Sequence, residues 1–229
     1  MVADEGYARG RLGSRPSGTV GGAPVGLRPL ELSAGSDGYL YVPAGYEARL
    51  PAPLVLLLHG AGEDARDGLA QLRQQADGAG LILLALNSRG PTWDLILGRG
   101  RYGHDVATID EALGQTFSSY AVDPGRVAVG GYSDGASYAI SLGISNGDLF
   151  GHVLAFSPGF MAPVGRVGSP RFFVSHGTRD VWLPIDRTSR RLVPELEGAG
   201  YEVLYREFEG PHVVPPSIAQ EAAGWLNAP

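Results

Sequence analysis

The chain has 229 residues, of which 44% are hydrophobic, and this length and composition favour one compact domain with a sizeable core. Its 18 basic and 24 acidic residues give a formal net charge of −6, which disfavours nucleic acid and anionic membranes as partners. There is no cysteine, so disulfides, thiolate zinc sites and a cysteine nucleophile are excluded.

The N-terminal segment gives little information about chemistry. The first ten residues carry two acidic side chains and no apolar run, which is unlike a signal peptide, and no stretch approaches membrane-spanning length. The default expectation is a cytoplasmic protein, and a homodimer is compatible with the sequence. Residues 10–26 are rich in Gly, Pro, Ser and Arg, so we expect residues 1–26 to form an N-terminal arm or an edge strand of a single domain spanning 1–229.

The rest of the chain alternates between strand and helix patterns. Two edge strands are predicted over residues 27–33 and 38–42, joined by a turn at 34–37. Short apolar runs, typical of buried parallel strands, then follow at 54–58, 81–86, 127–129, 153–156 and 172–174. Helical patterns cover 65–79, 105–120, 133–142, 185–199 and 217–226. This order predicts an α/β fold with a doubly wound, mostly parallel sheet and helices on both faces.

Ligands of such sheets bind beyond the carboxyl ends of the strands, so the residues after each apolar run are the candidates for chemistry. Residues 131–135, Gly-Tyr-Ser-Asp-Gly, match the G-x-S-x-G pattern of a nucleophilic serine on a tight strand-to-helix turn. The pattern occurs again around Ser145, at the far end of the helical segment that Ser133 opens. Ser133 is therefore the candidate nucleophile, with an ordinary helix N-cap as the structural alternative, and Ser145 is expected to be structural.

A loop with the sequence His59-Gly60-Ala61-Gly62 directly follows the apolar run 54–58. This is the place where an α/β hydrolase has a loop whose backbone N–H contributes to an oxyanion hole. We expect Ala61 to supply one N–H and Asp134, the residue after the nucleophile, to supply the other. The His59 side chain is expected to bond local backbone groups.

The same loop also permits a dinucleotide-binding interpretation, Gly60-x-Gly62-x-x-Ala65. Two details disfavour it. Glu63 and Asp64 would face a pyrophosphate with like charge, and the next strand ends at Leu86-Asn87 without the acidic residue that binds ribose.

The acid and base of a catalytic triad follow two later strands. Asp180 ends the segment 176–180, His-Gly-Thr-Arg-Asp, after the run 172–174. His212 follows an apolar and polar alternation at 203–208 and precedes the last helix. The chain order Ser133, Asp180, His212 is the one that the α/β-hydrolase fold requires.

The remaining histidines do not have the paired spacing of zinc ligands, so no metal and no cofactor are expected. His104, His152 and His176 are scattered, and His176 is expected to pack at a strand end.

Together, the segments 59–62, 131–135, 176–180 and 210–212 resemble the phospholipase/carboxylesterase family of bacterial α/β hydrolases, over about residues 38–226. The resemblance implies an α/β-hydrolase fold without a lid domain and a serine esterase acting on small-molecule carboxylic esters. Its relatives include acyl-protein thioesterases and polyhydroxyalkanoate depolymerase-like proteins, so a thioester or polyester substrate is an alternative. A binding module that has kept the fold is the non-hydrolase alternative. Many relatives have Gln after the nucleophile, and the Asp134 side chain is expected to turn away from the oxyanion hole.

The substrate pocket is expected to have aromatic walls. Trp93 lies in the loop 88–104, Phe160 and Met161 follow the run 153–156, and Trp182 stands beside the candidate acid. The connection before the strand near residue 171 has room for a loop but not for a lid, which predicts a preference for short acyl esters.

Overall fold

Eight strands form one sheet in the computed structural model, which describes residues 6–18, 23–33 and 37–228. Their order is β1-β2-β4-β3-β5-β6-β7-β8, with β1, β2 and β4 paired antiparallel and the remaining neighbours parallel. The strands are β1 (Gly26–Glu31), β2 (Asp37–Val42), β3 (Ala52–Leu58), β4 (Ile82–Leu86), β5 (Val122–Tyr132), β6 (His152–Phe156), β7 (Arg171–Gly177) and β8 (Val203–Phe208). The five predicted buried strands and the predicted edge pair are thus present, and most of the predicted turn at 34–37 lies outside the described residues.

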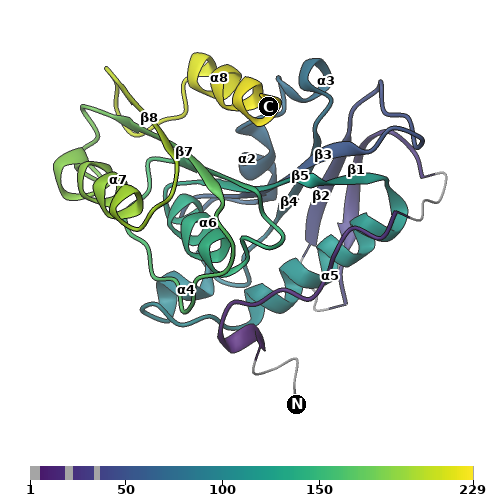
Figure 1. Cartoon of the computed structure of the whole chain (residues 1–229), viewed down its shortest axis with the longest axis horizontal. Coiled ribbons are helices and arrows are strands. Elements are labelled where there is room, and N and C mark those ends of the chain that lie inside the picture. Colours follow the sequence, from purple (N-terminus) through teal and green to yellow (C-terminus); the bar gives the residue numbers. More distant parts are fainter. Residues whose placement is uncertain (1–5, 19–22, 34–36, 229) are drawn as a thin grey trace.

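Helices cover both faces of the sheet (Figure 1). One face carries α2 (Ala65–Ala70), α3 (Ala76–Ala79) and α8 (Pro216–Leu226). The other carries α5 (His104–Ser119), α6 (Asp134–Ser145) and α7 (Ser189–Gly198), with the short helix α4 (Asp94–Leu97) and the 3₁₀ turn η1 (Ile185–Arg187) before α5 and α7. None of the described helices is long and apolar enough to cross a membrane.

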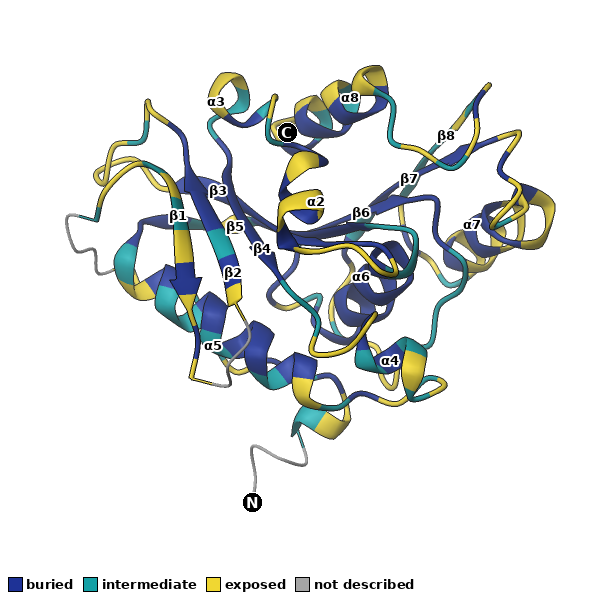
Figure 2. Ribbon diagram, turned by 180° about the vertical axis from the view of Figure 1, so that it is seen from behind, coloured by how far each residue is buried: buried dark blue, intermediate teal, exposed yellow. Residues whose placement is uncertain are grey.

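The core has two layers, one on each face of the sheet. In β3, Leu54, Leu56 and Leu58 belong to the layer under α5 and α6, whereas Val55 and Leu57 belong to the layer under α2 and α8. Successive side chains of a strand point to opposite faces, so a strand covered on both sides must be apolar throughout. In agreement with this, Figure 2 shows that the central strands are buried along their whole length.

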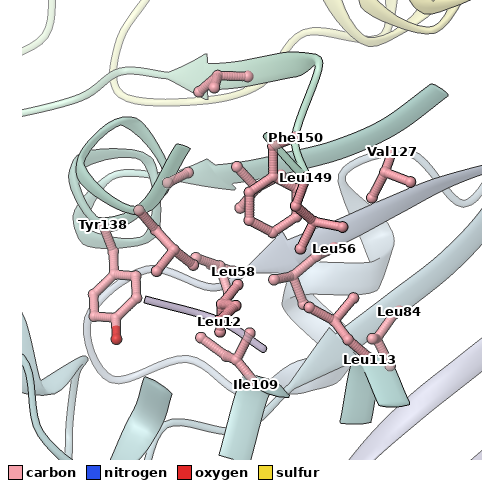
Figure 3. Close-up of a cluster of buried hydrophobic side chains, with 14 of the residues drawn as sticks. Leu12, Leu56, Leu58, Leu84, Ile109, Leu113, Val127, Tyr138, Leu149 and Phe150 are labelled. Carbon is pink, nitrogen blue, oxygen red and sulfur yellow. The ribbon is translucent and has the colours of Figure 1, made fainter. Parts of the chain in front are cut away.

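The described part of the N-terminal segment is an arm without strand structure. Residues 11–18 run along α5, where Leu12 joins the core beside Ile109 (Figure 3). The N–H of Gly13 donates to the Asp110 carboxylate at 2.9 Å. Residues 6–18 and 23–25 contain no strand, β1 begins at Gly26, and residues 1–5 and 19–22 lie outside the described residues.

The single helix predicted over residues 65–79 is wrong, because two short helices, α2 and α3, replace it. Between them the Leu72 N–H bonds the carbonyl of Leu69, and the Gln71 side chain donates to the carbonyl oxygen of Leu58 at 3.0 Å. The segment includes Gly68 and Gly78, which have low helix propensity. Packing against the sheet therefore decides the local path of the chain.

The strand order brings the loops after β3 and β5 together. The chain runs from β3 outward to β4 and then returns past β3 to β5, so the order reverses between these two strands. Leu58, the last residue of β3, is in register with Gly131 near the end of β5. Such a reversal is where ligands bind in open α/β sheets.

The turn from β5 into α6 requires two glycines. A Cβ atom on Gly135 would overlap the backbone carbonyl oxygen of Leu58, and one on Gly131 would overlap the backbone of Gly135. Helix α6 can therefore start close to the end of β3 only while both positions lack side chains.

We predict that Gly135→Ala destabilises the protein by about 2–3 kcal/mol, because the added methyl group must displace backbone rather than a flexible side chain. Gly78→Ala is the matched control. A Cβ there meets nothing within 4 Å, and alanine favours the helix. Urea unfolding of both variants tests this, and equal stability of the two would show that the turn tolerates a side chain.

Candidate active site

Ser133 occupies the turn between β5 and α6 with an unusual backbone conformation. Its φ of 57° and ψ of −118° lie in a region that residues with side chains rarely adopt. Its N–H donates to the carbonyl oxygen of Phe156 at 2.9 Å, which ties the turn to the end of β6. The Ser133 side chain lines a cavity at the carboxyl edge of the sheet.

Two loops bring His212 and Asp180 to this serine. His212 lies between β8 and α8, and its Nε2 is 2.9 Å from the Ser133 Oγ. Its Nδ1 is 2.5 Å from Oδ2 of Asp180, which follows β7. The structure thus brings together the three residues that the sequence analysis assigned to a triad, in a continuous line from hydroxyl to imidazole to carboxylate.

The Asp180 carboxylate is buried and accepts hydrogen bonds at both oxygens. Oδ1 accepts the N–H groups of Trp182 and Leu183, each at 2.9 Å. Oδ2 lies near two imidazoles, because Nε2 of His176 is 3.1 Å away in addition to His212. The sequence predicts only a packing role for His176, and its position four residues before Asp180 is the signal for this contact.

Tyr132 supports His212 from the other side. Its hydroxyl donates to the carbonyl oxygen of His212 at 2.7 Å, and the two rings lie 4.7 Å apart between centroids. Burial, together with the charges of Glu63 and Asp180, raises the pKa of the Tyr132 phenol, so the hydroxyl keeps its proton and remains a donor.

The loop after β3 is held by its own side chains. Nδ1 of His59 is 2.7 Å from the carbonyl oxygen of Gly60, and its Nε2 accepts the N–H of Ser88 at 3.0 Å. Both ring nitrogens thus contact backbone groups, in agreement with the expected supporting role. Glu63 accepts the N–H of Gly60 at 2.7 Å, and Ala61 lines the cavity beside Ser133.

A second loop, residues 87–93, joins this loop to the start of α6. The carbonyl oxygen of Pro91 accepts the N–H of Gly62 at 2.8 Å. The Thr92 hydroxyl donates to Oδ2 of Asp134, also at 2.8 Å. The Asp134 side chain therefore points to Thr92, while its own N–H belongs to the first turn of α6, where helix N–H groups lack partners within the helix.

The cavity has a volume of about 410 Å³ and includes four residues that the sequence analysis did not assign to it. Its lining consists of Gly60, Ala61, Glu63, Tyr132, Ser133, Trp182, Leu183 and His212. Trp182 is largely exposed at its rim. Glu63 and Tyr132 stand next to predicted site residues in the sequence, which is the signal that could have found them.

The other predicted pocket residues are not in this lining. Trp93 is buried in the core, where its indole N–H donates to the carbonyl oxygen of His59 at 2.8 Å and its ring packs between His59 and Tyr138. The Trp93 indole is large and apolar apart from its N–H, so it can be buried in the core once that N–H has an acceptor. Phe160 and Met161 are half-buried beyond the cavity, and Met161 packs against the core.

Across the described ranges, no three His, Asp or Glu side chains are grouped closely enough to hold a metal ion. The residues with polar side-chain atoms in the cavity lining are Glu63, Tyr132, Ser133, Trp182 and His212.

No sequence-family model matches the chain, and no curated protein does. Solved structures do match. The chain is 23% identical to the esterase PE8, with a TM-score of 0.69 over 82% of this chain and 96% of that one. A thermostable esterase, also 23% identical, gives a TM-score of 0.73 over 87% of this chain and 61% of its own. The S-formylglutathione hydrolase FrmB from Staphylococcus aureus, 14% identical, gives 0.68 over 90% and 99%.

These likenesses identify the architecture. The eight-stranded mixed sheet with helices on both faces matches all three structures over most of this chain. The chain therefore has the α/β-hydrolase fold, as the sequence analysis predicted.

Proposed function

We propose that this protein is a serine carboxylesterase that hydrolyses short-chain carboxylic esters through an acyl-enzyme intermediate. The observation that carries the proposal is the line from the Ser133 Oγ through both nitrogens of His212 to the buried Asp180 carboxylate. The similarity of the fold to proteins described as esterases supports the same reaction class.

The hydrogen bonds define a role for each side chain. A carboxylate can only accept, so Nδ1 of His212 carries the proton toward Asp180 and Nε2 is left to accept the proton of the Ser133 hydroxyl. The serine oxygen then attacks the ester carbonyl as His212 takes its proton. Asp180 holds the ring in this orientation and stabilises the imidazolium that forms.

The negative oxygen of the tetrahedral intermediate needs donors fixed before the reaction begins. We assign this role to the backbone N–H groups of Ala61 and Asp134. The hydrogen bond from the Thr92 hydroxyl to the Asp134 carboxylate supports the assignment, because it gives this negatively charged side chain a donor of its own. The intermediate collapses as His212 gives its proton to the leaving alcohol, and water then cleaves the acyl-serine by the same steps with His212 again as base.

The shape of the cavity supports small substrates. The connection from β6 to β7, residues 157–170, is fully described and contains no helix that could form a lid. Trp182 and Val181 beside the acid are largely exposed, so the rim is open to solvent. A long acyl chain would therefore find little wall to bury its outer carbons.

We expect Ser133→Ala and His212→Ala to lower kcat by about 10⁴-fold or more with the fold intact, because either change removes the transfer of the serine proton. Asp180→Asn should cost about 10³- to 10⁴-fold, since the amide favours the wrong imidazole tautomer. Steady-state kinetics on p-nitrophenyl acetate measure these effects. Ser145→Ala, which alters the second match to the serine pattern, is the control and should keep the wild-type kcat. Near-normal turnover by Ser133→Ala would end the proposal.

A series of p-nitrophenyl esters from acetate to palmitate tests the acyl preference. We expect kcat/KM to stop rising after a few carbons, because a methylene group gains about 0.8 kcal/mol only where there is apolar surface to bury it. The long esters are assayed below and above the concentration at which they form micelles. A maximum at long chains, or a rise in rate at the interface, would indicate a lipase and contradict the open site.

The charge of the cavity predicts discrimination between acyl groups of equal length. Among the described residues that line it, Glu63 is the one carboxylate and there is no arginine. An ester whose acyl chain ends in a carboxylate should have a kcat/KM at least about fivefold below that of the matching methyl-ended ester at low salt. Glu63→Gln keeps an acceptor for the Gly60 N–H and should narrow this gap, whereas Glu197→Gln, on the exposed side of α7, should not. Equal rates for both esters in the wild type would contradict the prediction.

A further inference from the structure

His176 is a second histidine on the carboxylate of the proposed triad, and the reaction as derived above does not use it. It lies near the end of β7 and is fully buried, and it does not line the cavity. Its Nε2 is 2.8 Å from the carbonyl oxygen of Leu183 and 3.1 Å from Oδ2 of Asp180. Its Nδ1 is 2.6 Å from the Ser189 hydroxyl, at the start of α7.

These partners determine which nitrogen of His176 carries a proton. The Leu183 carbonyl can only accept, so Nε2 must be the protonated nitrogen. Ser189 can donate its hydroxyl proton to Nδ1. Burial lowers the pKa of His176 below that of an ordinary histidine, so the ring is neutral and Nδ1 remains an acceptor.

We infer that His176 is a positioning residue whose Nε2 proton is shared between the Leu183 carbonyl and Oδ2 of Asp180. This contact orients the carboxylate and weakens its attraction for the proton on His212. This inference rests on the proposed triad. Oδ1 of Asp180 accepts two backbone N–H groups, and Oδ2 lies 3.1 Å from Nε2 of His176 in addition to its bond with His212.

The physical consequence concerns protonation at the active site. A carboxylate that accepts an additional hydrogen bond attracts the proton of His212 less strongly, because part of its charge is already compensated. Without the His176 donor, the pair formed by Asp180 and His212 takes up a proton more readily. Protonated His212 cannot accept the serine proton, so activity should be lost at a higher pH as the solution is acidified.

Three other titratable groups face His176, namely Glu207, His212 and Asp180. Its neighbour in the register of β8 is Glu207, which is bound to Arg190 of α7 at 2.6 Å, so this carboxylate already has a cationic partner. From the loop before α8 it faces His212, and from its own loop it faces Asp180. Of these groups, only Asp180 has an atom within hydrogen-bond distance of the His176 ring.

The test compares pH profiles of kcat/KM for the wild type, His176→Phe and His176→Gln, after Ser133→Ala has been shown to be inactive. Phenylalanine fills the space without a donor, whereas the glutamine amide places an N–H near the position of Nε2. We expect the acid limb of the His176→Phe profile to move up by about one pH unit, as the loss of one donor to a charged group predicts. His176→Gln should restore the wild-type limb. KM should not change, because His176 does not line the cavity.

His152→Phe is the matched control. His152 is also a buried strand histidine whose pKa is lowered by burial, but it begins β6, at the end of the strand opposite Ser133. It should leave the acid limb in place. An acid limb that is the same in wild type and folded His176→Phe would overturn the inference while leaving the esterase proposal standing. Activity retained in Ser133→Ala would instead overturn the proposed function.

A measurement on the wild type does not depend on whether His176→Phe folds. Long-range proton–nitrogen NMR spectra of histidine-labelled protein should contain one ring, absent in His176→Gln, that stays neutral with its proton on Nε2 between about pH 6.5 and 8, above the ordinary histidine pKa. Ser189→Ala removes the hydroxyl donor and should shift the acid limb in the same direction as His176→Phe. A His176 ring that titrates in this range, or that carries its proton on Nδ1, would contradict the inference.

Discussion

The candidate site depends on the left-handed backbone of one residue, Ser133, at the junction of β5 and α6. This conformation turns the chain from β5 directly into α6, which begins at the next residue, Asp134. It persists because Gly131 and Gly135 let the helix approach β3 closely and because the N–H of Ser133 is bonded to the end of β6. The energetic cost of the strained turn is offset by the buried strands on either side.

The rest of the site is arranged around that turn by hydrogen bonds between loops. The loop of residues 87–93 binds both the loop after β3 and the start of α6. Its contacts are made by the backbone carbonyl of Pro91, the Thr92 hydroxyl and the indole N–H of Trp93. On the other side, the loop after β7 folds over the Asp180 carboxylate and presents it to His212. A carboxylate this buried needs hydrogen-bond donors around it, and the role proposed for His176 meets this need.

The parts of the structure that could be predicted from the sequence are those with a local signal. The apolar runs predict the central strands because both faces are covered, and Ser133, Asp180 and His212 each follow a strand, so the parallel sheet places all three at one edge. Trp93 could not be placed, because whether an indole lines a pocket or enters the core depends on which loops fold over it. The break between α2 and α3 and the contact of His176 with Asp180 likewise arise from tertiary packing, although the four-residue spacing of the latter pair is visible in the sequence.

Covalent trapping can show whether Ser133 is a nucleophile that His212 activates. The purified protein would be reacted with a fluorophosphonate, digested, and the modified peptide identified by mass spectrometry. We expect one adduct, on Ser133, that forms rapidly and parallels the loss of esterase activity, with Ser145 unmodified and with much slower labelling in His212→Ala. An adduct on another residue, or an active protein that the reagent does not modify, would show that Ser133 is not the nucleophile.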